Sequence, residues 1–293
     1  AGCMEAMALC LKAVTQPGDA VATESPTYYG IFRVMESLGL HVVEVPTDPV
    51  TGIDLDYLER AIPKFDIKAC LFVPNFNNPV GSCIPDDKKK QLVQLLAKKE
   101  IPLIEDDIYG EMYFGKNRPK TCKSFDRKGL VLHCGSFSKS LAPGYRVGWV
   151  IPGRFKDRVI SLKRMNNIST NTLAQTSIAH FLQKGRYELH LRNLRKSLHT
   201  QSLNYLQAMN EYFPEDTKVT RPQGGFVLWV EMNKKIDGYK LHKRALKHGI
   251  GIAPGQIFSS SQQFRNYFRL SYGMPFHEKA WKGIKILGEL MRS

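Results

Sequence analysis

The first half of the chain alternates short β-rich runs with segments whose apolar residues recur at helical spacing. The β-rich runs predict strands over residues 20–24, 41–46, 69–73, 103–106 and 131–136. Residues 54–62 and 85–99 predict helices between them, and Pro85 opens the second with two aspartates in its first turn. Strands that alternate with helices indicate an α/β fold with a mostly parallel sheet covered by helices.

The pattern changes in the second half of the chain. Residues 154–212 have almost wholly helical spacing, and β-rich runs follow over residues 226–231, 250–253 and 267–271, with helices between and after them. We therefore predict a large domain over residues 1–190 and a smaller α+β domain over residues 191–293.

The composition is that of a folded protein, because 43% of the 293 residues are hydrophobic and can form a substantial core. The sequence contains no run of about 18 apolar residues, the length that is needed to span a membrane. Residues 1–20 also lack the basic start and apolar stretch of a signal peptide. These features predict a cytoplasmic protein without a membrane partner. The six cysteines have no metal-ligand spacing, which favours buried free thiols over disulfides or a metal site.

The formal net charge of +15 is concentrated in two stretches. Residues 154–201 hold ten Lys or Arg against two acids, and residues 232–248 hold six against one. A basic face can attract nucleic acid or acidic ligands, but on amphipathic helices it is usually solvated surface. The charge alone therefore identifies no partner.

The segment from Gly135 to Arg146 carries the first candidate chemistry. It follows a predicted strand and places Ser136, Ser138, Lys139 and Arg146 within eleven residues. A partly buried lysine can form an imine with an aldehyde, while hydroxyls and a guanidinium can hold a phosphate. The set suits a phosphorylated aldehyde, although a lone Ser-x-x-Lys is more often a solvated turn.

A run of acidic residues, Glu105-Asp106-Asp107, ends the preceding predicted strand, where open parallel sheets bind ligands. Alternation places Asp106 on the opposite face from its two neighbours. A buried carboxylate there can keep a pyridine nitrogen protonated. A solvated loop and a Mg²⁺ site are the alternatives that the run leaves open.

Four further groups are candidates, each with an ordinary structural alternative. The Asn77-Asn78-Pro79-Val80-Gly81 segment is a turn whose amide can donate to a ring oxygen. Gly2, Cys3 and Met4 open a predicted helix, whose free N–H groups attract anions. Tyr28 offers a flat ring for stacking. Arg269 lies in an apolar strand, where a guanidinium needs a carboxylate partner.

Taken in this order and spacing, the motifs resemble those of fold type I pyridoxal-phosphate enzymes, specifically the class I and II aminotransferases. The resemblance covers essentially the whole chain. It rests on Asn78-Pro79-x-Gly81, Asp106-x-x-Tyr109, Ser136-x-Ser138-Lys139 with Arg146 seven residues on, Gly224-Gly225-Phe226, and Arg269 with its flanking strand. It implies the aspartate aminotransferase fold, with a mostly parallel seven-stranded sheet, helices on both faces and a smaller α+β C-terminal domain.

The resemblance also implies pyridoxal 5'-phosphate as the cofactor, held by Lys139 as a Schiff base. Lys139 would also move a proton between the substrate Cα and cofactor C4'. Asp106 would pair with the pyridinium nitrogen, and Asn78 and Tyr109 would hydrogen-bond the ring oxygen O3'.

The remaining implied roles concern the phosphate, the ring face and the substrate. The phosphate would be bound by Ser136, Ser138, Arg146 and the helix start at Gly2, Cys3 and Met4. Tyr28 would stack on the ring, and Arg269, with Asn78, would bind the substrate carboxylate. The resemblance further implies a homodimer with its sites at the subunit interface, and we predict a cis peptide between Asn78 and Pro79.

Residues 24–30, 105–111 and 138–149 look closest to the aminotransferase-like domain of MocR-type regulators of the GntR family. Those regulators carry a winged-helix DNA-binding domain ahead of this one. The chain begins directly at a helix start, so we expect it to lack that domain and the N-terminal part of the aminotransferase fold. DNA binding is then expected only through a domain outside this chain.

Three functions follow from these expectations. The first is transamination between an amino acid and a 2-oxo acid, because Lys139 and Arg269 would supply proton transfer and carboxylate binding together. The second is an effector-sensing domain of a DNA-binding transcriptional regulator. The third is a pyridoxal-phosphate lyase or decarboxylase, since the same cofactor can break any bond to Cα.

Overall fold

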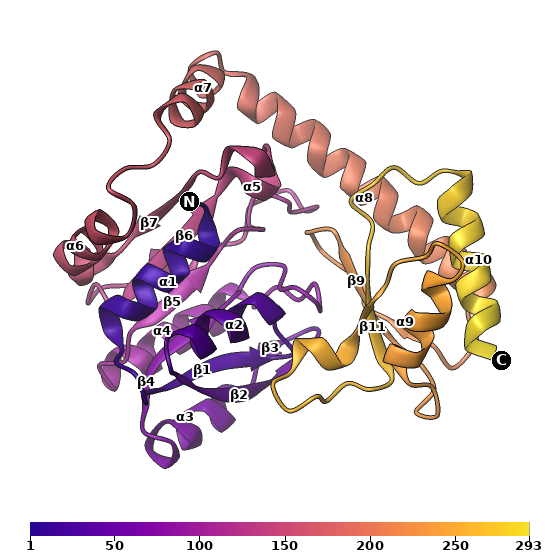
Figure 1. The fold of residues 1–293 in the computed structure, drawn as a ribbon, viewed down its shortest axis with the longest axis horizontal. Helices are drawn as coiled ribbons and strands as arrows, with labels where there is room; N and C mark the ends of the chain where they lie inside the picture. The colour runs from indigo at the N-terminus through magenta and orange to yellow at the C-terminus, as the bar shows by residue number, and fades with distance from the viewer. Residues whose placement is uncertain (293) are drawn as a thin grey trace.

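The computed structural model describes residues 1–292 and contains two sheets with helices packed around them (Figure 1). The strands of the larger sheet are β1 (Ala20–Ser25), β2 (His41–Asp48), β3 (Gly52–Ile53), β4 (Ile67–Phe72), β5 (Leu103–Asp106), β6 (Val131–Ser136) and β7 (Gly148–Ile151). Within residues 1–292 this sheet has seven strands, in the order β3-β2-β1-β4-β5-β6-β7.

The sheet is mostly parallel, as predicted. Strands β2, β1, β4, β5 and β6 pair in parallel, while β3 and β7 are antiparallel to their neighbours at the two edges. The five predicted strands are the parallel ones, and both edge strands were missed. β3 has only two residues, which is too short for a pattern to be recognised. β7 begins with Gly148, and glycine weakens the signal of a strand.

Helices cover both faces of this sheet. Along β4, Ala69 and Leu71 belong to a core that includes α1 (Cys3–Val14) and α2 (Tyr29–Ser37). Cys70 and Phe72 point the other way, into a core that includes α3 (Leu55–Lys64) and α4 (Asp86–Lys98). The two-residue period of a strand therefore separates the two apolar layers.

The middle of the chain is helical, as predicted. The short α5 (Phe137–Ser140) carries Lys139, and α6 (Lys156–Asn167), α7 (Thr172–Gln183) and α8 (Arg186–Tyr212) follow β7. In Figure 1, α7 lies at the outer end of the molecule, and α8 runs from there to the second sheet. The domain boundary that we propose between residues 190 and 191 falls inside α8.

The second sheet is antiparallel and is built from β8 (Lys218–Val219), β9 (Val227–Glu231), β10 (Ala253–Pro254) and β11 (Tyr267–Ser271). Its order over the described residues is β10-β11-β9-β8, and α9 (Gly238–Leu246) and α10 (Glu278–Arg292) belong to the same part of the chain.

Two details of the second sheet differ from the prediction. The strand expected over residues 250–253 shares only Ala253 with the two-residue β10. Gly249 and Gly251 flank Ile250, and glycine weakens a strand. The two-residue β8 was missed for the same reason as β3.

The described residues bear on two expectations from composition. All six cysteines are free, as predicted, and only Cys83 is not fully buried. No helix within residues 1–292 has the length and apolar content needed to cross a membrane.

Candidate active site

Most of the predicted site residues gather at one end of the larger sheet. Tyr28 follows β1, Asn78 follows β4, Asp106 ends β5 and Ser136 ends β6. These strands are neighbours and run in parallel, so their carboxyl ends meet at one edge. Ligands of open parallel sheets bind at this edge.

The Asp106 carboxylate is 5% exposed and lies against the start of α1. Its Oδ1 accepts hydrogen bonds from the Cys3 thiol, at 3.0 Å, and from the Ile108 N–H, at 3.2 Å. Burial raises the pKa of Asp106 to about 6. The thiol contact was not anticipated, because the sequence suggested only a backbone role for Cys3.

The neighbouring carboxylate of Glu105 lies on the other face of the sheet, as alternation predicted. It accepts hydrogen bonds from the Cys122 N–H at 2.6 Å and the Lys123 N–H at 3.0 Å. Asp107 binds Asn75 and Arg118. The three carboxylates therefore do not converge, and no cluster of His, Cys, Asp or Glu suited to a metal ion occurs in residues 1–292.

Asn78 links two other predicted residues across the two sheets. Its Nδ2 donates to the Tyr109 hydroxyl at 3.3 Å, and its Oδ1 accepts from Arg269 Nη1 at 3.2 Å. Arg269 lies on β11, and its buried Nε has no hydrogen-bond partner among the described residues. The predicted cis peptide between Asn78 and Pro79 is confirmed, and a second one precedes Pro26.

Hydroxyl and guanidinium groups meet at the end of β6. Ser136 Oγ donates to Ser138 Oγ at 2.7 Å, and Arg146 Nη1 donates to Ser138 Oγ at 3.3 Å. Gly2, which caps α1, lies against the same guanidinium: a Cβ on Gly2 would be 2.7 Å from Arg146 Nη2. One corner therefore collects hydrogen-bond donors from the end of β6, from the loop after it and from the start of α1. Met4 lies in the first turn of α1.

Lys139 lies beside this corner and is exposed. Desolvation of its ammonium, together with the positive charges of Arg269 and Arg146, lowers its pKa. Its Nζ is 5.6 Å from the centre of the Phe226 ring, and it makes no ion pair within the described residues. A lysine in this setting is easier to deprotonate than a solvated one.

Tyr28 has a half-buried ring at the end of β1. A Cβ on Gly30 would overlap the Tyr28 Cε1, so glycine at position 30 gives the ring the space it occupies. The Tyr28 and Tyr29 rings are 4.6 Å apart.

This geometry agrees with what comparison with protein families finds. Residues 1–278 match the family described as aminotransferase class I and II. The chain belongs to this family.

Relatives in the class I and II aminotransferase family include an uncharacterized HTH-type transcriptional regulator, YjiR, of Escherichia coli strain K12. It is 40% identical over 288 residues, which are 98% of this chain and 61% of the relative. The chain thus spans about three fifths of the length of this relative.

Solved aminotransferases of the family have the same fold. A Pyrococcus horikoshii kynurenine aminotransferase, in complex with PMP, superposes with a TM-score of 0.92 at 31% identity, over 99% of this chain and 73% of that one. An α-aminoadipate aminotransferase of Thermus thermophilus, LysN, complexed with N-(5'-phosphopyridoxyl)-L-leucine, gives 0.93 at 29% identity, over 99% and 75%. The predicted aspartate aminotransferase fold is therefore confirmed.

The family implies pyridoxal phosphate, and the groups present fit it. A carboxylate, an amide with a phenol, a corner of hydroxyl and guanidinium donors, and a lysine match four different parts of this molecule. The strongest observation is the corner where Gly2 faces Arg146, because a Cβ on Gly2 would lie 2.7 Å from Arg146 Nη2 and a side chain at position 2 would displace the guanidinium that suits a phosphate.

Two aromatic residues of the site were not among the predicted site residues. Phe226 contacts Tyr109 edge to face at 5.6 Å as well as lying near Lys139, and Phe258 lies 5.6 Å from the Arg269 guanidinium. The Gly224-Gly225-Phe226 motif was a usable signal for Phe226. No local pattern marks Phe258, because the pairing of β10 with β11 brings the segment after β10 to Arg269.

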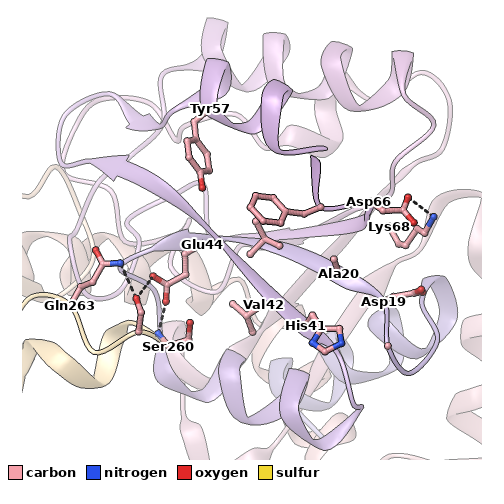
Figure 2. Close-up of a pocket in the computed structure, with 14 residues that line it drawn as sticks. Asp19, Ala20, His41, Val42, Glu44, Tyr57, Asp66, Lys68, Ser260 and Gln263 are labelled. Atoms are coloured by element: carbon pink, nitrogen blue, oxygen red, sulfur yellow. Dashed lines mark hydrogen bonds and ion pairs between the residues drawn. The ribbon is translucent and has the colours of Figure 1, made fainter. Parts of the chain in front are cut away.

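A groove of about 590 Å³ lies elsewhere, along β1 and β2 (Figure 2). It is lined by Asp19, His41 and Lys68, among others, which lie at the amino ends of strands. None of the predicted site residues lines it. At one side Glu44 accepts a hydrogen bond from the Ser260 N–H, which joins the first sheet to a loop near the second (Figure 2).

Proposed function

We propose that this chain forms the cofactor-binding part of a pyridoxal-phosphate-dependent aminotransferase, which transfers an amino group between an amino acid and a 2-oxo acid. The observation that carries the proposal is Lys139. Desolvation and the positive charges of Arg269 and Arg146 lower the pKa of Lys139, while the negative charge of Asp106 acts in the opposite direction.

Each part of the cofactor has a residue that would hold it. Asp106 would keep a proton on the pyridine nitrogen, since its carboxylate is buried and needs a counter-charge. Asn78 and Tyr109 would hydrogen-bond the ring oxygen, and Tyr28 would cover the ring face. The phosphate would be held by Ser136, Ser138, Arg146 and the α1 start at Gly2, Cys3 and Met4.

Bound pyridoxal phosphate supplies a ring that takes up negative charge from the amino acid Cα. Lys139 would hold the aldehyde carbon and then carry a proton between Cα and the cofactor's C4'. The lowered pKa of Lys139 favours the neutral amine, which is the form that can accept a proton. Arg269 would bind the α-carboxylate, and its unpartnered Nε leaves it a free donor for that task.

The test of this function is a panel of amino acids added to the protein loaded with pyridoxal phosphate, with visible absorbance as the readout. We expect at least one amino acid to convert the cofactor to its pyridoxamine form in a single turnover. Lys139→Ala should abolish the visible band of the bound cofactor. A loaded protein whose spectrum no amino acid changes would contradict the enzyme function.

A second function is favoured by the similarity to YjiR, whose name describes a transcriptional regulator. In that case the same site would bind an amino-acid effector without turnover, and DNA would be bound by a domain outside this chain. Effector binding without formation of a pyridoxamine product would support it.

We also propose a homodimer in the cytoplasm. Support for self-association comes from α6, α7 and the turn between them, where Met165, Ile168 and Leu173 are 79 to 86% exposed. Large exposed apolar side chains in one segment are typical of an interface. The buried free thiols support a reducing compartment.

A further inference from the structure

One buried carboxyl group near the site has no role in the proposed function. Glu24, near the end of β1, is 2% exposed. Its Oε1 accepts hydrogen bonds from the Val73 N–H at 2.7 Å and from Asn77 Nδ2 at 2.6 Å. Its Oε2 has no partner within residues 1–292. A buried carboxyl group with an unpartnered oxygen is unfavourable, so its presence requires a reason.

The Glu24 carboxyl group anchors the turn that follows β4. The turn closes on Asn77, whose backbone O accepts from the Gly81 N–H at 2.6 Å and whose backbone N–H donates to the Ser82 carbonyl at 2.9 Å. The side chain of Asn77 also accepts from the Val80 N–H, at 3.4 Å. Asn77 is therefore held from both sides, by its own turn and by Glu24.

The residue next to this anchor is Asn78, whose side chain must point in one direction to work. Its Nδ2 faces the Tyr109 hydroxyl and its Oδ1 faces Arg269. Rotation of the turn would break both contacts together. The Glu24–Asn77 hydrogen bond joins residues 53 positions apart in sequence, so it is a tertiary constraint on this turn rather than a local cap.

We propose that Glu24 is a positioning residue of the candidate active site, which fixes Asn77 and thereby directs Asn78 toward Tyr109 and Arg269. The inference rests on the proposed function, because Asn78 matters only if it holds the cofactor's ring oxygen and orients Arg269. Glu24 is not a catalytic residue, since it contacts Asn77 and not Asn78.

The test compares Glu24→Leu, Glu24→Gln and Asn77→Ala in the full chain. Two quantities are measured: the Kd for pyridoxal phosphate, by visible absorbance, and amide hydrogen exchange over residues 77–82. In Glu24→Leu two buried donors lose their acceptor, so we expect the Kd to rise about tenfold and exchange over the turn to accelerate by a similar factor. In Glu24→Gln the amide oxygen accepts the same two hydrogen bonds, so both quantities should return to within about threefold of the wild type.

The matched control is Glu44→Gln, in the middle of the neighbouring strand β2. Glu44 also accepts hydrogen bonds from two segments, but none comes from the 77–82 turn. This variant should leave both quantities unchanged. If Glu24 affected only overall stability, amide hydrogen exchange would instead accelerate throughout the larger sheet, and it would do so in Glu24→Leu and Glu44→Gln alike.

A double-mutant cycle isolates the pair. Glu24→Leu and Asn77→Ala together should weaken cofactor binding no more than the worse single variant, because both remove one constraint. Additive effects would overturn the proposal, and so would an unchanged Kd or unchanged exchange in Glu24→Leu. If Glu24→Leu does not fold, Asn77→Ala takes its place and the same two outcomes decide.

The proposed function and this inference fail separately. If the wild-type protein does not bind pyridoxal phosphate, the proposed function is contradicted. Exchange over residues 77–82 then still decides whether Glu24 fixes the turn. If the wild type binds and Glu24→Leu binds equally well, the positioning role alone is wrong.

Discussion

Burial of carboxyl groups sets the electrostatics of the site at the scale of single residues. Asp106 and Glu24 are both near the carboxyl ends of parallel strands, and desolvation raises the pKa of Asp106 to about 6 and that of Glu24 to about 7. A carboxyl group in this range changes charge within the working pH of most proteins. The two carboxyl groups hold different segments, because Asp106 accepts a hydrogen bond from Cys3 of α1, whereas Glu24 accepts one from Asn77 of the 77–82 turn.

Replacing Asp106 with asparagine tests the charge at this position without changing its shape. The amide oxygen of the new side chain can still accept from the Ile108 N–H, but no negative charge remains to hold a proton on the ring nitrogen. We expect single-turnover conversion of the bound cofactor to slow by about 100-fold, as for the loss of one preorganised electrostatic group. Stopped-flow absorbance measures it, and Glu105→Gln on the opposite face is the control. Conversion at the wild-type rate in Asp106→Asn would contradict the role of Asp106.

The pKa of Glu24 predicts how stability changes with pH. Burial raises it from 4.5 in the unfolded chain to about 7, and the nearby Asp106 carboxylate adds to the rise. Between these values the folded protein binds more protons than the unfolded chain, so the free energy of unfolding decreases as pH rises. The Glu24 share of this decrease, from pH 4.5 to pH 8, is about 3 kcal/mol.

Urea denaturation at pH 5 and pH 8 measures this effect. The free energy of unfolding of Glu24→Gln, which cannot ionise at position 24, should decrease less between pH 5 and pH 8 than that of the wild type. The contribution of Asp106, which also lowers the free energy of unfolding as pH rises, should remain. Glu44→Gln should have the wild-type pH dependence. A Glu24→Gln variant with the wild-type pH dependence would show that Glu24 does not titrate in this range.

At the scale of elements, the site depends on how closely α1 approaches the edge strand β7. A Cβ on Gly148 would lie 2.8 Å from the Gly2 carbonyl carbon and 2.9 Å from the Gly135 carbonyl oxygen. All the atoms in the way are backbone, so a side chain at position 148 must separate the strand from the helix start. The absence of a side chain there is what allows the α1 N-terminus to reach the corner with Arg146.

Gly148→Ala should therefore displace α1. We expect a loss of about 1–3 kcal/mol in the free energy of unfolding, typical of overpacking, and weaker binding of pyridoxal phosphate. Urea denaturation and absorbance titration measure the two effects. Gly144→Ala is the control, because a Cβ at position 144 meets nothing within 4 Å. If Gly148→Ala and Gly144→Ala had the same free energy of unfolding and bound pyridoxal phosphate equally well, the site would not depend on the close approach of α1 to β7.

At the scale of the whole molecule, the two sheets and the outer helices have different degrees of burial. The sheets share one apolar core, which includes residues from α1 to α10. By contrast, α6 and α7 each bury a single residue, Val159 and Ile178. Helices with so little burial gain stability from packing against another surface, which agrees with the proposed homodimer.

The homodimer predicts the effect of two surface changes. Ile168→Ser with Leu173→Ser removes apolar surface that is 86% and 79% exposed in the single chain. We expect the wild type to sediment as a dimer and the double variant to shift toward monomer, as read by analytical ultracentrifugation. Val50→Ser, at an apolar residue 76% exposed elsewhere, should leave the dimer intact. A wild-type monomer would contradict the proposal.

The local pattern was sufficient to predict most of the fold. Strands β1, β2, β4, β5 and β6 were predicted because each lies in a short β-rich run. The helices α3 and α4 and the helical region of residues 154–212 were predicted because apolar residues recur there every three to four positions. Lys139 and Asp106 were predicted because their motifs directly follow or end such strands. Motifs and periodicity are properties of neighbouring residues, so the sequence alone can reveal them.

Contacts between distant segments were decided by the tertiary structure. The Asn78–Arg269 hydrogen bond joins residues 191 positions apart, and the Cys3–Asp106 contact joins residues 103 positions apart. The anchoring of Asn77 by Glu24 belongs to the same class. None of these has a local signal, because each depends on where the packing of helices and sheets places two side chains. The sequence by itself determined which groups are available for a phosphorylated pyridine aldehyde, and the tertiary structure decided which of them hold one another in place.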